Sequence, residues 1–128
     1  MNIKNIFSLL VALFMAVSIQ AQNSIDKMVT QYSSVGGSVF TSAVQRNPKT
    51  RKVEKVVKRL KIDEPQSRRF AEAFKREARA HGNSTTKQQG GDMTIIFTEE
   101  NKNNNRIYML KSEDNGSSAE VTIIIRLK

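Results

Sequence analysis

MTIIFTEENKNNNRIYMLKSEDNGSSAEVTIIIRLK, residues 93–128, decides the fold class of this chain. It contains three short runs of β-branched, aromatic and other apolar residues, and segments rich in Asn, Asp, Gly and Ser separate them. This composition is typical of strands joined by turns. We therefore expect an antiparallel meander whose three strands cover residues 93–98, 106–110 and 120–128.

The periodicity of these runs also favours strands. Every second residue from Val121 to Leu127 is apolar, and Met93, Ile95 and Phe97 alternate in the same way. Because successive side chains of a strand point to opposite sides, each of these sets forms one apolar face. Asn115-Gly116 predicts a hairpin, since both residues accept a positive φ.

Two segments predict helices that can cover this sheet. Residues 23–34 carry apolar residues at helical spacing, and Asn23 or Ser24 can cap their N-terminus. Residues 65–80 carry two Phe and several Ala on one side and most of their Arg elsewhere. Asp63 can cap this second helix.

The remaining segments are less uniform. Residues 38–45, SVFTSAVQ, favour a strand, whereas residues 81–92, HGNSTTKQQGGD, predict a polar loop. Residues 53–62, VEKVVKRLKI, are ambiguous. Their apolar residues form a helical stripe, which slightly favours a helix, but three of the four residues in that stripe are Val, and β-branched residues favour strands.

These elements predict a single small α+β domain over residues 22–128. The apolar face of the C-terminal three-stranded meander must be buried, and the two predicted helices can cover it. We therefore expect a two-layer fold with an antiparallel sheet of four to five strands covered by two helices.

Residues 1–21, MNIKNIFSLLVALFMAVSIQA, match a secretory signal peptide. Lys4 gives a short positive N-terminal region, an uncharged run from Ile6 to Val17 follows, and the small residue Ala21 precedes the expected cleavage site. The run is shorter than the roughly 18–20 apolar residues of a membrane span. We expect an exported protein, periplasmic or extracellular, that is soluble after cleavage near Ala21-Gln22 and has no transmembrane segment in the mature chain. The absence of Cys fits export from a bacterium.

Positive charge is concentrated in residues 46–79, which hold thirteen Lys or Arg against five Asp or Glu, whereas residues 92–128 hold five against six. We expect no cytoplasmic nucleic acid as a partner of an exported protein. The available polyanions are lipopolysaccharide, anionic lipids, acidic glycans and extracellular DNA. Each Lys or Arg near an anionic membrane contributes about 1 kcal/mol, although a run of charges is usually only a solvated surface. A polyanion site would consist of Arg51, Lys52, Lys55, Lys58, Arg59, Arg68, Arg69, Arg76 and Arg79.

Few residues indicate catalysis or metal binding. His81 is the only His, and no nucleophile–base pair is recognisable near it by spacing, so we interpret it as a helix-end or solvated side chain. A zinc site needs three or four Cys, His or acidic ligands, and Cys and His are nearly absent. Glu99-Glu100 is a poor catalytic pair, because adjacent strand residues point to opposite faces. We therefore expect no enzyme, no catalytic residue, no cofactor and no metal.

A wider pattern runs through SIQAQ at 18–22, SVFTSAVQRNPKTRKVEKVVKRLKI at 38–62, FAEAFKREA at 70–78, NRIYML at 105–110 and VTIIIRLK at 121–128. On these segments the chain resembles a family of short exported proteins of unknown function, common in Bacteroidetes-type bacteria. The resemblance covers nearly all of the mature chain, and none of its motifs is catalytic. It implies that residues 53–62 form a strand leading into the following helix, and it implies no known activity.

Two kinds of function fit these observations. The first is a non-enzymatic binding or interaction module of the cell envelope, whose ligand is a protein partner or a sheet-edge peptide. The alternative is binding of a polyanion or an anionic membrane surface through residues 46–79. A third hypothesis is a hydrolase with a carboxylate site that the sequence does not reveal.

Overall fold

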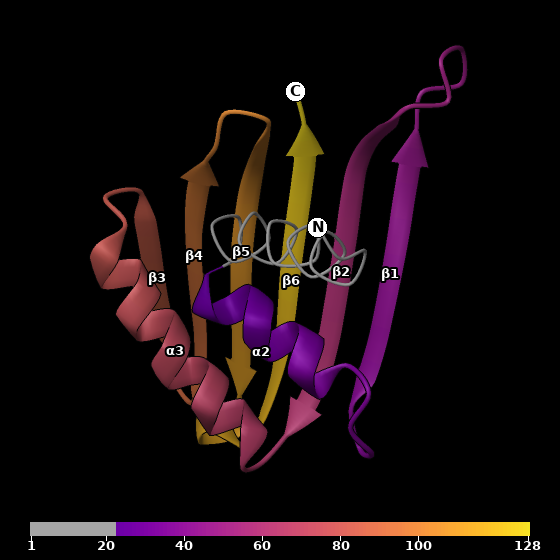
Figure 1. The fold of residues 1–128 in the computed structure, drawn as a ribbon. Coiled ribbons are helices and arrows are strands. Elements are labelled where there is room, and N and C mark those ends of the chain that lie inside the picture. Colours follow the sequence, from indigo (N-terminus) through magenta and orange to yellow (C-terminus); the bar gives the residue numbers. More distant parts are fainter. Residues whose placement is uncertain (1–22) are drawn as a thin grey trace, which may run out of the picture.

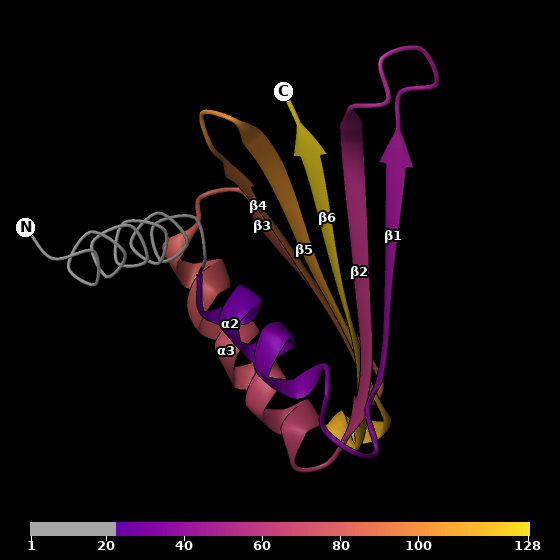
Figure 2. The same ribbon diagram turned by 45° about the vertical axis from the view of Figure 1, so that its right-hand side comes forward.

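A six-stranded antiparallel sheet forms one layer of the protein, and two helices cover one face of it (Figures 1 and 2). The computed structural model describes residues 23–128, so the predicted signal peptide lies outside the described residues. The elements are α2 (Ser24–Tyr32), β1 (Val39–Arg46), β2 (Val53–Asp63), α3 (Gln66–Ala80), β3 (Ser84–Gln89), β4 (Asp92–Glu100), β5 (Asn104–Glu113), the 3-10 turn η1 (Asp114–Gly116) and β6 (Ser118–Leu127).

The strand order is β1-β2-β6-β5-β4-β3, and every neighbouring pair is antiparallel. After β2, α3 carries the chain across the covered face to the far edge of the sheet, where β3 begins (Figure 1). The chain then returns strand by strand, and β6 inserts between β5 and β2. The predicted α+β class, with a sheet covered by two helices, is therefore confirmed.

The start of α2 follows the predicted capping chemistry. The Asn23 side chain accepts hydrogen bonds from the backbone N–H groups of Ile25 and Asp26, and the Asp26 side chain accepts one from the Asn23 N–H. This reciprocal arrangement satisfies N–H groups that have no partner within the helix. Ile25 and Val29 are buried beneath α2, in agreement with the predicted apolar stripe.

The predicted start of α3 is wrong in one detail. Asp63 is the last residue of β2, where it pairs with Ser118, so it does not cap the helix. The helix begins at Gln66, directly after Pro65, and no side chain caps its N-terminus. The strand pairing therefore takes precedence over the capping propensity of Asp63.

The core lies between the helices and the four inner strands. Its largest buried side chains are aromatic: Phe70 and Phe74 of α3, Phe97 of β4 and Tyr108 of β5. The ring centroids of Phe74 and Phe97 are 5.6 Å apart, and those of Phe97 and Tyr108 are 4.8 Å apart. Burying a large apolar side chain stabilises the fold by about 1.5–3 kcal/mol, so these rings contribute much of the driving force.

The helical interpretation of residues 53–62 is wrong, and the strand implied by the resemblance is confirmed. β2 is hydrogen-bonded to β1 on one side and to β6 on the other. Leu60 and Ile62 are buried on its helix-covered face, at the spacing of two that a strand requires. Pairing on both sides and the β-branched valines outweigh the helical spacing of the same residues.

The predicted loop over residues 81–92 is also wrong, because it contains β3. This strand pairs with β4 from Ser84 to Gln89, and Gly90-Gly91 form the two-residue connection, with Gly90 at a φ of +62°. All six residues of β3 are exposed, so no alternation of apolar residues could reveal the strand. With β3 included, the sheet has six strands, one more than the upper limit of the four to five predicted.

The predicted apolar face of the last strand is confirmed for most of its length. Val121 and Ile123 are buried and Ile125 is half-buried, whereas Leu127 is 44% exposed. The helices lie towards the other end of the sheet and do not cover the end of β6 (Figures 1 and 2).

Candidate functional site

A cluster of polar side chains closes one end of the helix–sheet interface. It forms where the N-terminus of α2 and the C-terminus of α3 meet the helix-covered face of β4 and β5. Hydrogen bonds and ion pairs connect Asn23, Ser24 and Asp26 of the α2 start, Glu77 and His81 of the α3 end, Glu99 of β4, and Arg106 and Tyr108 of β5.

One part of this polar cluster is a buried ion pair supported by a phenol. Arg106 Nη1 donates to Asp26 Oδ2 at 2.9 Å, and the Tyr108 hydroxyl donates to the same oxygen at 2.8 Å. The side chains of Arg106 and Asp26 are 11% and 6% exposed. A buried charge without a partner costs several kcal/mol, so each of these groups depends on the others.

The surroundings shift the pKa values of two of these groups. Burial raises the pKa of Tyr108 far above its ordinary value, and the charges of Asp26 and Glu99 act in the same direction. Burial alone would lower the pKa of Arg106, but its hydrogen bond to Tyr108 and the charges of Asp26 and Glu99 outweigh burial and raise it. Tyr108 is therefore a neutral hydrogen-bond donor, and Arg106 is a permanent cation.

The other part of the polar cluster surrounds the single imidazole. His81 Nδ1 lies 2.7 Å from the backbone oxygen of Glu77, and His81 Nε2 lies 3.2 Å from Glu99 Oε2. The Phe97 ring packs against the imidazole with a centroid distance of 4.8 Å. The side chains of His81, Glu77 and Glu99 are each 20% exposed, so solvent reaches all three.

The start of α2 orients both carboxylates beside His81. Asn23 Nδ2 donates to Glu99 Oε2 at 2.8 Å, and Ser24 Oγ donates to Glu77 Oε1 at 2.6 Å. One ligand-type atom from each of Glu77, His81 and Glu99 lies within 4.8 Å of the other two. Hydrogen-bond donors of this kind fix the direction of carboxylates in metal and catalytic sites.

Spacing alone could have revealed only half of this arrangement. Glu77 and His81 are four residues apart, so a helix places them on one side. The sequence left a helix end or a loop as the position of His81, and the structure shows that it is the C-cap residue of α3. Glu99 reaches the same place because β3 and β4 form a hairpin, and the sequence prediction had assigned β3 to a loop.

The nine basic residues predicted as a polyanion site do not form one patch. Arg51 and Lys52 lie in the loop between β1 and β2, Lys55 and Arg59 lie on the open face of the sheet, and Lys58 shares the helix-covered face of Leu60 and Ile62. Arg68, Arg69, Arg76 and Arg79 belong to α3.

Two of the basic residues on α3 already have partners. Arg68 Nη2 pairs with Glu64 Oε1 at 2.7 Å, and Arg69 Nη1 donates to the Tyr32 hydroxyl at 3.0 Å. The basic residues are therefore divided among the β1–β2 loop, the two faces of β2 and α3, and their role in polyanion binding stays a prediction.

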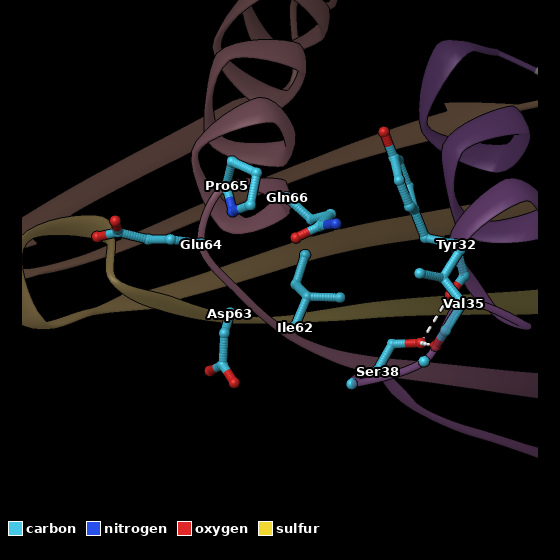
Figure 3. A pocket seen from close by; sticks show the side chains of 10 residues that line it. Tyr32, Val35, Ser38, Ile62, Asp63, Glu64, Pro65 and Gln66 are labelled. Carbon is cyan, nitrogen blue, oxygen red and sulfur yellow. Dashed lines mark hydrogen bonds between the residues drawn. The ribbon is translucent and has the colours of Figure 1, made fainter.

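A small pocket lies where α2 leads into β1 and β2 leads into α3 (Figure 3). Its volume is about 300 Å³, at the lower limit of the roughly 300–1,000 Å³ of ligand pockets. The Asp63 and Glu64 side chains point outward from it, and Ser38 Oγ lies 2.6 Å from the backbone oxygen of Val35 (Figure 3). Two acidic residues and no basic residue line the pocket, so it disfavours an anion.

The two edges of the sheet differ in their exposed side chains. β1, VFTSAVQR, has no charged residue before Arg46 and exposes Val39 by 60% and Val44 by 52%. β3, STTKQQ, is entirely polar and carries Lys87 near its middle. The residues that normally protect an edge from pairing are charged, and β1 lacks them over seven of its eight positions.

Comparison with known proteins identifies the family of the chain. The family described as a domain of unknown function (DUF5024) matches residues 22–124. The chain belongs to this family. The DUF5024 match spans every described element except the end of β6. The predicted resemblance to a family of unknown function is confirmed, whereas the bacterial group and export stay predictions. No curated protein and no solved structure gives a significant match.

Proposed function

We propose that this protein is a non-enzymatic binding module of the cell envelope, and that its ligand is an extended acidic segment of a partner protein that adds to the sheet along β1. The observation that supports this proposal is the unprotected edge of β1. A sheet-edge strand presents unpaired N–H and C=O groups to any extended chain that aligns with it.

The side chains of β1 suit such a ligand. Val39, Thr41 and Ala43 lie on the open face, and Phe40, Ser42 and Val44 lie on the helix side, as the register with β2 requires. An added strand would find small and apolar neighbours on both faces. Such neighbours accept many partner sequences without a clash, so the backbone supplies most of the affinity.

The charge of the neighbouring strand favours acidic partners. β2 presents Lys55, Arg59 and Lys61 on the open face, two strand positions from an added strand, or roughly 10 Å. This distance is comparable to the Debye length at moderate salt, so the attraction of an acidic segment is only partly screened. A second copy of this chain brings the same positive charges, which disfavours pairing between two β1 strands.

The expected compartment follows from the signal-peptide pattern of residues 1–21. Neither helix of the described part of the chain has the length and hydropathy of a membrane span. We propose that the partner is an envelope protein with an exposed acidic segment, and that the mature protein is periplasmic or extracellular.

Amide hydrogen exchange of β1 tests this function. The probe is a capped octapeptide of alternating Glu and Val, and the control is the matching peptide of Lys and Val. We expect the Glu peptide to slow exchange in residues 39–46 and the Lys peptide to leave it unchanged. Equal protection by both peptides, protection confined to β3, or no protection contradicts the proposal. Protection that rises with protein concentration without peptide indicates self-pairing and also contradicts it.

A second candidate function has one observation in its favour. Lys55 of β2 lies directly opposite Arg126 of β6, and both point to the open face. Like charges directly opposite each other destabilise a sheet, unless an anion lies between them. Together with the exposed Arg51 and Lys52, this pair makes the loop end of β2 the best-placed part of the predicted polyanion site.

Vesicle binding distinguishes this second function from the first. The protein would be mixed with vesicles that contain lipopolysaccharide or plain anionic lipid, at low and physiological salt. Lys55→Glu with Arg126→Glu should abolish binding, whereas Arg76→Glu with Arg79→Glu on α3 should retain it. If both double variants lost vesicle binding equally, the net charge of the protein, and not a specific site, would explain the binding.

A further inference from the structure

We propose that Glu77, His81 and Glu99 bind a divalent transition-metal ion, for which Zn²⁺ is the reference probe. This site is independent of the β1 edge. It lies at the opposite end of the covered face, where α3 ends and β4 runs beneath the start of α2.

The contacts of His81 show that its Nε2 atom can bind a metal ion. A backbone carbonyl only accepts hydrogen bonds, so the 2.7 Å contact with the Glu77 oxygen requires a proton on Nδ1. In a neutral ring Nε2 then carries a lone pair, and it faces the carboxylate oxygen of Glu99 at 3.2 Å. Two acceptors at this distance repel each other unless a proton or a metal ion lies between them.

The local charge favours a divalent cation. Three carboxylates, of Asp26, Glu77 and Glu99, share the polar cluster with one guanidinium, that of Arg106. A divalent ion beside the imidazole balances the excess of two negative charges. The Asp26 oxygen that accepts from Arg106 and Tyr108 already has its partners, so the ligands are the other two carboxylates.

The groups that would orient the metal ligands are already in place. Metal-binding His residues usually donate their other N–H to a carbonyl or carboxylate, as His81 does to Glu77. Ser24 holds Glu77 Oε1 at 2.6 Å, and Asn23 holds Glu99 Oε2 at 2.8 Å. Glu77 keeps Oε2 for an ion, and Glu99 Oε2, which faces Nε2, keeps a second lone pair. The 20% exposure of each side chain leaves room for water ligands.

The ligand set selects the class of metal. One imidazole nitrogen and two carboxylates suit Zn²⁺ and its neighbours among the divalent transition metals, whereas Mg²⁺ and Ca²⁺ prefer oxygen ligands alone. Three protein ligands leave at least one coordination position for water. The bound ion would join α3 to β4 and, through Asn23 and Ser24, to the start of α2.

Calorimetric titration of tag-free, chelator-treated protein with ZnCl₂ tests the proposal. We expect one Zn²⁺ per chain and no heat from MgCl₂ at the same concentration. Glu99→Gln should weaken binding by more than about 100-fold, because even the loss of a residue that only orients a metal ligand costs about 10–100-fold. Ser24→Ala should weaken it by about 10-fold. Glu100→Gln is the matched control, since it removes the same charge from the next residue of β4 and should leave binding unchanged.

The single imidazole provides a direct readout. His81 is the only His and the chain has no Cys, so nitrogen NMR of one ring reports coordination without overlap. Zn²⁺ should shift Nε2 while Nδ1 keeps its proton, and far-UV circular dichroism should show that the variants fold. If both ring nitrogens carry a proton and Zn²⁺ does not change their signals, His81 only forms an internal salt bridge with the carboxylates. This result would overturn the proposal. Equal Zn²⁺ affinity of Glu99→Gln and Glu100→Gln would overturn it as well.

Discussion

Two parts of the sheet, the strands β4 and β5 and the hairpin of β1 and β2, differ in how the helices cover them. The first is called the packed side, and the second the exposed side. β4 and β5 lie beneath the helices and bury Ile95, Phe97, Tyr108 and Leu110, whereas β1 has no buried side chain (Figure 1). The loop between β1 and β2 projects beyond both helices (Figure 2). One continuous sheet therefore combines a packed side, which carries the stability, with an exposed hairpin whose edge is available to a partner.

The largest expected contrast between the two sides comes from aromatic truncation. Phe74→Ala should destabilise the protein by about 3–5 kcal/mol, because the ring is fully buried and packs on Phe97. Phe40→Ala in β1 should cost much less, since Phe40 is only partly buried. Urea denaturation would measure both changes from the midpoint at constant slope. Equal costs would show that the hairpin belongs to the same packed core.

A charge comparison should give an effect of similar size. Arg106→Met should cost about 3–5 kcal/mol, because it leaves the buried carboxylate of Asp26 without its ion partner. Arg126→Met, on the exposed face of the next strand, should change stability by no more than about 0.5 kcal/mol. The same denaturation experiment measures both variants. A small effect of Arg106→Met would mean that water reaches Asp26.

Tyr108→Phe should have an intermediate effect with a distinct pH dependence. Loss of the hydrogen bond to the Asp26 carboxylate should cost about 1.5–3 kcal/mol at neutral pH. The pKa of Tyr108 is raised in the folded protein, so the unfolded chain releases the phenolic proton first. The stabilisation is complete below about pH 10, the ordinary tyrosine pKa, and decreases above it by about 1.4 kcal/mol per pH unit.

Denaturation midpoints of the wild type and Tyr108→Phe between neutral and alkaline pH check this sign. The difference between the two proteins should be constant up to about pH 10 and should shrink above it. A constant difference throughout the alkaline range would show that the phenol titrates equally in the folded and unfolded chains.

Local patterns predicted the packed side better than the exposed one. The alternation in β4 and β6, the stripe of α2 and the Asn23 cap follow directly from residue spacing, because each of these elements faces one shared core. The residue spacing of β2 slightly favours a helix, so only the family resemblance predicted this strand, and β3 has no apolar alternation that predicts it. Pairing partners, and not their own periodicity, hold both segments in the sheet. The strand count was too low for the same reason.

The polar cluster could not be predicted because it depends on distant residues. Asp26 and Tyr108 are 82 positions apart in the chain, and Asn23 and Glu99 are 76 apart. Only the topology, in which α3 crosses the sheet and β3 returns beside β4, brings them together. Of all these contacts, sequence spacing contained only the helical pair of Glu77 and His81 and the cap contact between Asn23 and Asp26.

A substitution with only a small expected change in stability tests the exposed β1 edge most directly. Val44 is 52% exposed on the edge strand, so Val44→Glu should cost about 1 kcal/mol or less. The same change places a negative charge beside the proposed acidic ligand, and it should abolish the hydrogen-exchange protection of residues 39–46 by the Glu–Val peptide. Thr85→Glu introduces the same charge at the other edge, on exposed β3, and should leave that protection intact.

A variant that keeps the stability of the protein while losing the response to the peptide would separate the two sides of the sheet functionally. If Val44→Glu and Thr85→Glu reduced the protection equally, net charge would explain the peptide effect and the β1 edge would have no special role. If neither variant reduced the protection, the peptide would bind away from Val44 and Thr85. The difference between the two edges would then affect folding but not peptide binding. The outcome thus depends on whether a negative charge matters at Val44 itself, because both variants have the same net charge and both sites are exposed.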